Sequence, residues 1–216
     1  MSFLRQAAML PDHFAMIGAV IGSLGGFYYL YETIAGKAQP NRITWLLWGI
    51  FPMVIFVAQR AQGVEGASWA SFAAGFTPLL VFAASFFNKN AYWKSEPRDY
   101  YLMAAAILGL ILWAMTDRPN LALLFSLLAD VLASIPTLIK SYRHPHSESW
   151  IAYAVSAFGF GISFLSVQTY HFENVAFVAY VFILNGTLAV LASRSPRHQQ
   201  ATPSKGERDE QRTGGA

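Results

Sequence analysis

Four polar side chains lie along one side of an apolar stretch between residues 120 and 140. They are Ser126, Asp130, Ser134 and Thr137, and their spacings of four, four and three residues place them on one face of a helix. A carboxylate inside an apolar span is costly unless it is protonated, paired or open to water. Asp130 would therefore serve as a proton carrier or as a ligand for a polar or cationic solute. The alternative is a carboxylate that only holds neighbouring helices together.

Polar and helix-bending residues also occur inside other apolar stretches. A proline within a helix removes a backbone hydrogen bond and bends the helix, so prolines at these depths would supply hinges. The predicted substrate-binding residues are Asp130, Asn185, Trp48, Ser126, Ser134 and Ser156. The predicted hinge or gate residues are Pro136, Thr137, Pro52 and Glu32.

Simpler roles are open for several of these residues. The two prolines would also be compatible with static kinks, and Asn185 with a hydrogen bond that only joins two helices. Glu32, which lies among three tyrosines, would either contribute to a gate or extend its carboxylate to the membrane surface. Trp45 and Trp150 each come near the start of an apolar stretch, which predicts anchors at the membrane interface.

Composition excludes several classes of protein. The chain is 55% hydrophobic and 12% charged, whereas about a quarter of the residues of a soluble domain are charged. Cysteine is absent, which excludes disulfides and thiolate metal sites. His144 and His146 flank Pro145 in a loop, which favours a solvated turn over a metal site. No HExxH motif, nucleotide-binding loop or triad-like cluster is present, so we expect neither enzymatic activity nor a cofactor.

Repeated apolar runs of nearly membrane-spanning length predict an all-α, multi-pass membrane protein. The expected spans are 14–34, 43–60, 69–88, 99–116, 120–140, 149–168 and 174–192. The first 13 residues lack the pattern of a cleaved signal peptide. Residues 194–216 are polar, and we expect them to be disordered.

Lysine and arginine counts predict the orientation of these spans. Only Arg5, Arg60 and Arg118, of 15 basic residues, fall on the side of the N-terminus. Because basic residues favour the cytoplasmic side, we expect the N-terminus outside and the C-terminus in the cytoplasm of a cell or inner membrane. Basic residues in short loops also argue against nucleic acid as a partner.

The chain contains a weak internal repeat. Aligning QPNRITW (39–45) with HPHSESW (144–150) superimposes spans one to three on spans five to seven and leaves span four unmatched. Both copies read basic turn, proline, hydroxyl, tryptophan, helix. An odd number of intervening spans gives the two units the same direction, and parallel repeats are a known plan of transporters.

This layout, with Pro136-Thr137 before a basic turn, resembles the PQ-loop superfamily, in particular the SWEET and SemiSWEET sugar transporters and more distantly the nicotinamide riboside transporters. The resemblance implies two parallel three-helix bundles, 14–88 and 119–193, joined by a loop and linker helix in 89–118. It implies alternating-access transport of a small sugar-like or vitamin-like solute, uniport or proton-linked, by a monomer or homo-oligomer in the lipid bilayer. The alternative is a receptor or scaffold of the same helix plan that does not transport; a lipid-modifying membrane enzyme is disfavoured.

Overall fold

The computed structural model describes residues 10–11, 13–61, 68–87, 93–116, 119–168 and 172–195. These residues form seven α-helices and one short 3₁₀ helix, with no β-strand in the described part. The helices are α1 (His13–Ile34), α2 (Arg42–Ala61), α3 (Ser68–Phe87), α4 (Pro97–Ala114), α5 (Pro119–Arg143), η2 (Pro145–Ser147), α6 (Trp150–Leu165) and α7 (Phe172–Ser193). The prediction of an all-helical chain is confirmed.

Helix starts follow from local capping chemistry. At the start of α2, the Asn41 side-chain oxygen accepts hydrogen bonds from the backbone N–H groups of Ile43, at 3.1 Å, and Thr44, at 3.3 Å. At the start of α6, the Ser149 hydroxyl oxygen accepts a bond of 3.3 Å from the Ala152 N–H. These side chains satisfy N–H groups that the first helical turn leaves free.

Three helices are long and apolar enough to cross a membrane, by length and composition: His13–Ile34, Leu124–Arg143 and Val175–Ser193. Three shorter apolar helices accompany them, at Arg42–Val57, Ala74–Phe87 and Trp150–Leu165. Of the seven expected spans, three described helices therefore meet this measure of a membrane span.

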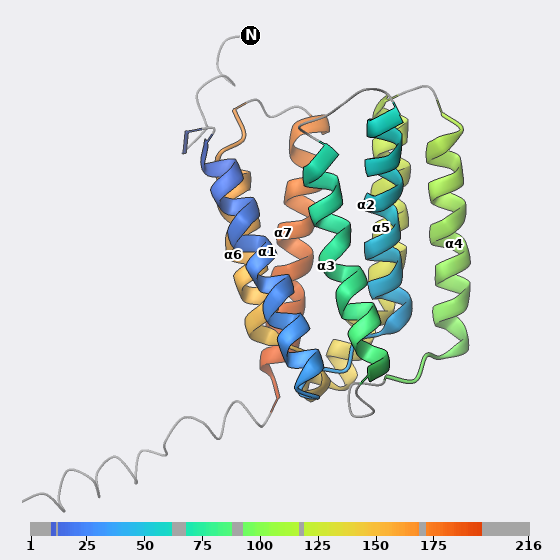
Figure 1. Cartoon of the computed structure of the whole chain (residues 1–216), viewed down its shortest axis with the longest axis vertical. Helices are drawn as coiled ribbons and strands as arrows, with labels where there is room; N and C mark the ends of the chain where they lie inside the picture. Colours follow the sequence, from blue (N-terminus) through green and yellow to red (C-terminus); the bar gives the residue numbers. More distant parts are fainter. Residues whose placement is uncertain are drawn as a thin grey trace, which may run out of the picture.

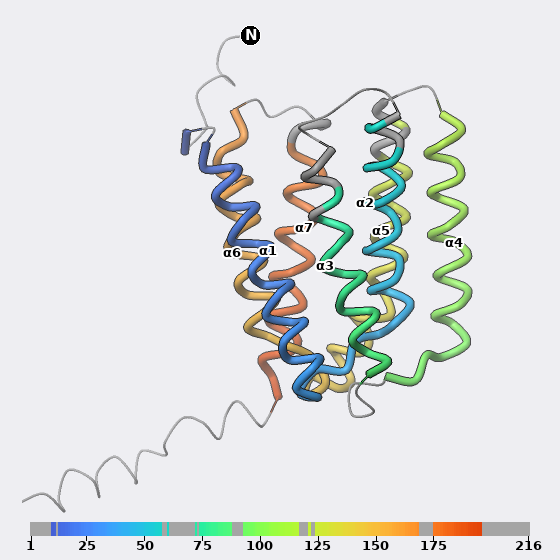
Figure 2. The backbone as a smooth tube through the Cα atoms, viewed as in Figure 1, coloured from blue at the N-terminus to red at the C-terminus, as the bar shows by residue number. Residues whose placement is uncertain are grey.

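Consecutive helices run in opposite directions and form one bundle (Figure 1). Helix α3 contacts both α1 and α2, α7 contacts both α5 and α6, and α4 packs mainly against α5. The most extensive helix pair is α1 with α6, whereas α2 and α5 share a smaller contact. In Figure 2, the ends of α1, α3, α5 and α7 and the starts of α2, α4 and α6 lie at the lower end, which we call the turn end; the opposite end is the far end.

Glycines allow the close approach of α1 and α6. A Cβ on Gly25 would collide with the Ser156 hydroxyl and the Ala152 carbonyl, and one on Gly159 would collide with the backbone of α1. Helical spacing in the span 14–34 predicts a small-residue face of Ala15, Gly18, Gly22 and Gly26. The buried face runs instead through Gly18, Gly22 and Gly25, while Gly26 faces Thr77 of α3.

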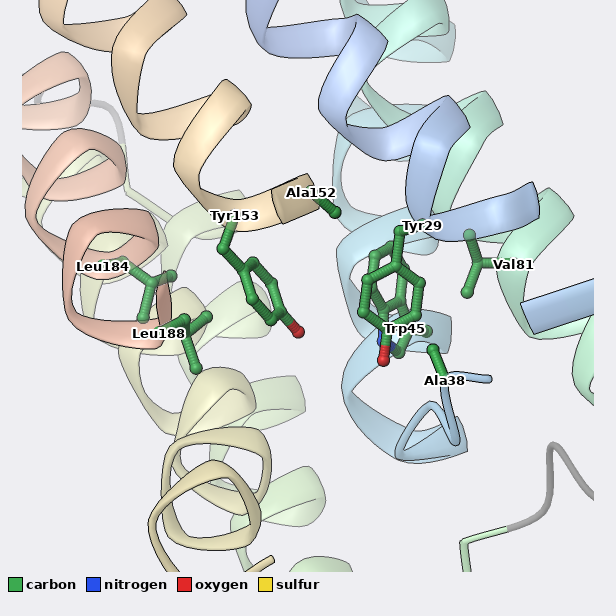
Figure 3. Close-up of a cluster of buried hydrophobic side chains, with 8 residues drawn as sticks. All are labelled: Tyr29, Ala38, Trp45, Val81, Ala152, Tyr153, Leu184 and Leu188. Carbon is green, nitrogen blue, oxygen red and sulfur yellow. The ribbon is translucent and has the colours of Figure 1, made fainter. Parts of the chain in front are cut away.

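A buried aromatic and aliphatic cluster fills the bundle near the turn end (Figure 3). The cluster comprises Tyr29, Ala38, Trp45, Val81, Ala152, Tyr153, Leu184 and Leu188. Trp45 is only 4% exposed and its ring centroid lies 4.3 Å from that of Tyr29. The prediction of an interfacial anchor at Trp45 is therefore wrong, because the residue turns into the core; Trp150 is half-buried.

Candidate functional site

The two turns that the sequence repeat aligned with each other are in contact at the turn end. The Gln39 backbone N–H, in the turn after α1, donates a hydrogen bond of 2.8 Å to the Ser147 carbonyl, in the turn after α5. This bond joins the first three helices to the last three. It also brings the end of α5 against the residues that precede α2.

A buried ion pair lies beside this bond. The Lys140 Nζ, near the end of α5, is 2.7 Å from Glu148 Oε1, just before α6, and both side chains are almost completely buried. The same ammonium donates to the Gln39 carbonyl and lies 5.1 Å from the centre of the Trp93 ring. The lysine is therefore held by a carboxylate, a carbonyl and an aromatic face.

Two tyrosines bind the other oxygen of the same carboxylate. The Tyr29 hydroxyl donates a bond of 2.6 Å to Glu148 Oε2, and the Tyr153 hydroxyl donates one of 2.9 Å. Figure 3 shows both hydroxyls directed to the same end of the cluster. Short bonds to a charged acceptor are among the strong hydrogen bonds of proteins. Both carboxylate oxygens of Glu148 are thus engaged.

We call Tyr29, Gln39, Lys140, Glu148 and Tyr153 the turn-end network. Tyr29 and Gln39 belong to the first half of the chain and the other three to the second. Removing two charges from water is expensive, and the cost is offset only where geometry is good and further hydrogen bonds satisfy both ions. The network meets that condition, and it ties the two halves together.

Other polar contacts add to the closure of the turn end. The Asn41 side-chain amide donates to Asp99 of α4 at 3.1 Å. Arg42 donates to the Ser85 hydroxyl at 2.9 Å and to the Ser85 carbonyl at 2.6 Å. The Thr44 hydroxyl donates to the Ala133 carbonyl of α5 at 2.8 Å. Residues at this end are therefore fixed by directional bonds as well as by packing.

The predicted polar face of α5 becomes more accessible with distance from the turn end. Thr137 and Ser134 are 0% and 1% exposed, whereas Asp130 and Ser126 are half-buried. The Ser134 hydroxyl donates to the Val131 carbonyl at 2.8 Å. Tyr180 of α7 is a neighbour of Asp130, and its buried hydroxyl has no hydrogen-bond partner among the described residues.

The other three predicted substrate-binding residues lie elsewhere in the bundle. Ser156 is buried at the α1–α6 contact, where its hydroxyl donates to the Gly22 carbonyl at 3.0 Å, so it is occupied in helix packing. The Asn185 amide donates to the Val181 carbonyl of its own helix at 2.9 Å. Trp48 is half-buried against the aromatic cluster, with its ring edge-on to Trp45.

The predicted hinge residues lie inside helices as expected. Pro136 is fully buried in α5, and Pro52 is half-buried in α2. The Thr137 hydroxyl is buried and has no hydrogen-bond partner among the described residues. Glu32 is half-buried beside Tyr28, so the carboxylate at the centre of the turn-end network is Glu148 rather than Glu32.

The sequence predictions placed Lys140 at the end of the span 120–140 and Glu148 in the basic turn after it, so they missed this network. One signal was present: an isolated acid in the segment KSYRHPHSESW, between a helix end and a helix start. Among the described residues, no group of three or more histidine, aspartate or glutamate side chains is arranged to hold a metal ion.

The described residues define an all-helical protein with three helices that are long and apolar enough to cross a membrane. Comparisons with protein-family models, with curated proteins and with solved structures found no match to this chain.

Proposed function

We propose that this chain is an integral membrane carrier that moves a small polar solute by alternating access. Its moving parts would be two three-helix bundles, α1–α3 and α5–α7, joined by α4 as a linker in a SWEET-like arrangement. The packing of α3 against both α1 and α2, and of α7 against both α5 and α6, supports this division. Parallel repeats place a substrate site between the two units, near the middle of the membrane.

The observation that carries this proposal is the turn-end network. The Tyr29 hydroxyl of the first half donates a hydrogen bond to the Glu148 carboxylate of the second half, and the Lys140 ammonium of that second half donates to the Gln39 carbonyl of the first. A static bundle gains little from buried ions that apolar residues would replace without loss of stability. A gate that must close and reopen benefits from bonds that water can replace.

The graded burial of α5 fits a conformation closed at the turn end. Polar residues next to the network are inaccessible, and those nearer the far end, Ser126 and Asp130, are half-buried. Pro136 lies within the inaccessible region, between Ser134 and Thr137. It follows Ala133 by three residues, and the Ala133 carbonyl accepts a hydrogen bond from Thr44 of α2. A bend at Pro136 would therefore shift the end of α5, which carries Lys140, away from the first bundle.

Single-cysteine labelling tests alternating access without knowledge of the solute, because the chain has no cysteine of its own. The Ser134→Cys variant is reconstituted in proteoliposomes, and a membrane-impermeant maleimide is added on one side or the other. We expect no reaction from the turn-end side in the otherwise unchanged chain. Glu148→Gln, which weakens the network, should make Ser134→Cys reactive from that side.

Two exposed positions report which side the reagent reaches: Tyr142→Cys at the turn end and Met115→Cys at the far end. Tyr29→Phe provides a milder change of the network if Glu148→Gln does not fold. If Ser134→Cys stays unreactive from the turn-end side in both folded variants, the chain does not alternate. A receptor or scaffold would give that result.

A further inference from the structure

The buried charges near the turn end are already balanced within the chain. Lys140 and Glu148 form a pair at 2.7 Å, and Asp99 has Arg98 at 3.6 Å. Asp130 differs from these groups. In the part of the chain that the structure describes, no lysine, arginine or histidine forms an ion pair with its carboxylate.

The groups around Asp130 are polar but uncharged. Tyr180 of α7 is a neighbour of the Asp130 carboxylate, and Ser134 is a neighbour of Tyr180. The Ser134 hydroxyl proton is directed to the Val131 carbonyl. Neutral neighbours of this kind can orient a carboxylate, but they leave the charge of this half-buried group uncompensated.

Aromatic side chains lie on the turn-end side of this region. Trp48 and Tyr180 both pack against the cluster that contains Tyr29, Trp45 and Tyr153. The indole N–H groups of Trp45 and Trp48 are buried and have no hydrogen-bond acceptor among the described residues, and Trp45 is only 4% exposed. Buried indole N–H groups usually have a hydrogen-bond partner. A ligand with a hydrogen-bond acceptor would supply that partner.

We propose that the solute is a small organic cation, an alkylammonium compound that also carries a hydrogen-bond acceptor such as a hydroxyl group. This inference rests on the proposed carrier function and narrows its substrate class. The ammonium would neutralise Asp130 and lie against the faces of the neighbouring aromatic rings, which attract cations. A neutral sugar would hydrogen-bond to Asp130 but would leave the negative charge of its carboxylate in place.

Binding to the purified full-length chain in detergent tests this proposal. The probes are ethanolamine and choline, with 3,3-dimethyl-1-butanol as the neutral isostere of choline and glucose as the neutral sugar. Isothermal titration calorimetry should detect binding of at least one ammonium probe and no binding of the isostere. Asp130→Asn should weaken that binding at least about tenfold, which corresponds to about 1.4 kcal/mol. Glu96→Gln, at an exposed carboxylate, should leave it unchanged.

Three results would overturn the cation proposal: no ammonium probe binds the folded chain, the isostere binds as well as choline, or Asp130→Asn leaves affinity unchanged. Asp130→Glu keeps the charge and should retain binding, so it provides the test if Asp130→Asn does not fold. If glucose binds and neither ammonium probe does, the cation proposal is overturned and the carrier proposal stays intact. The carrier proposal has its own test, and it fails if Glu148→Gln and Tyr29→Phe both leave the labelling of Ser134→Cys unchanged.

Discussion

At the scale of single residues, the strongest energetic feature is the buried pair of Lys140 and Glu148. Lys140→Met should destabilise the folded chain by about 3–5 kcal/mol, because it leaves an uncompensated buried carboxylate. The double variant Lys140→Met with Glu148→Gln should lose less stability than the two single losses added together. Equilibrium unfolding in detergent micelles is measured for the unchanged chain, the two single variants and the double variant. The four free energies of unfolding give the coupling energy between Lys140 and Glu148.

Lys37 provides the matched control for that experiment. It is an exposed lysine in the turn after α1, and Lys37→Met should change the free energy of unfolding by no more than about 0.5 kcal/mol. Equal effects of Lys37→Met and Lys140→Met would show that the pair is solvated in the folded chain, which would contradict the buried network.

The tyrosine hydroxyls lead to a second prediction at this scale. Tyr29→Phe keeps the ring in the aromatic cluster and removes one bond to Glu148, so it should cost about 1.5–3 kcal/mol, the range for hydrogen bonds to charged groups. Tyr31→Phe, on an exposed side chain two residues later, should be nearly neutral. Thermal unfolding of the two variants side by side gives the difference, and equal melting temperatures would contradict the assigned bond.

The sequence predicted the polar face of α5 but not the residues that close the turn end. Helical spacing is local, so Ser126, Asp130, Ser134 and Thr137 could be placed on one side of a helix from their positions alone. The pairing of Lys140 with Glu148 depends on the path of the turn between them, including the short helix at Pro145–Ser147. Tyr29 donates to the same carboxylate from α1. The two residues are far apart in the sequence, so no pattern of neighbouring residues predicts their contact.

At the scale of helices, the α1–α6 contact depends on the absence of side chains. Gly159→Ala places a methyl group against the backbone of Gly18 and Gly22, and overpacking of a closely packed site costs about 1–3 kcal/mol. Gly186→Ala is the matched control, because a Cβ at Gly186 has no heavy atom within 4 Å. This control should be neutral or slightly stabilising, since alanine favours helix more than glycine does.

Both glycine variants are compared by thermal unfolding of the purified chains. A Gly159→Ala chain as stable as Gly186→Ala would mean that α1 and α6 are farther apart than described. The same substitution should also reduce the bond between the Ser156 hydroxyl and the Gly22 carbonyl, because the two helices must separate to admit the methyl group.

Helix boundaries were more predictable than helix faces. Each of the seven described α-helices begins and ends within three residues of the apolar run that predicted it, because run length and flanking polar residues are properties of the sequence itself. The buried face of α1 was less predictable: Gly25 contacts α6 and Gly26 contacts α3. One residue changes the direction of a side chain by about 100°, and the position of α3 decides which glycine meets which helix.

At the scale of the whole molecule, two kinds of contact join the halves of the chain. The α1–α6 contact from Gly18 to Gly25 is backbone against backbone, and it cannot rearrange without losing close packing. The turn-end network, which starts at Tyr29, consists of hydrogen bonds and an ion pair. A conformational change would therefore begin at the turn end, with the glycine contact as the part that stays together.

Alternating access predicts opposite distance changes at the two ends of the bundle. Because the chain has no cysteine, two introduced cysteines can carry spin labels for double electron–electron resonance. The turn-end pair is Lys37→Cys with Tyr142→Cys, and the far-end pair is Val57→Cys with Leu121→Cys; all four positions are exposed. Adding Glu148→Gln should lengthen the turn-end distance and shorten the far-end distance, because rigid bundles that rock about a central contact open one end as they close the other. Lengthening at the turn end with no change at the far end would indicate local loosening of the network, and the two bundles would then not move as rigid units.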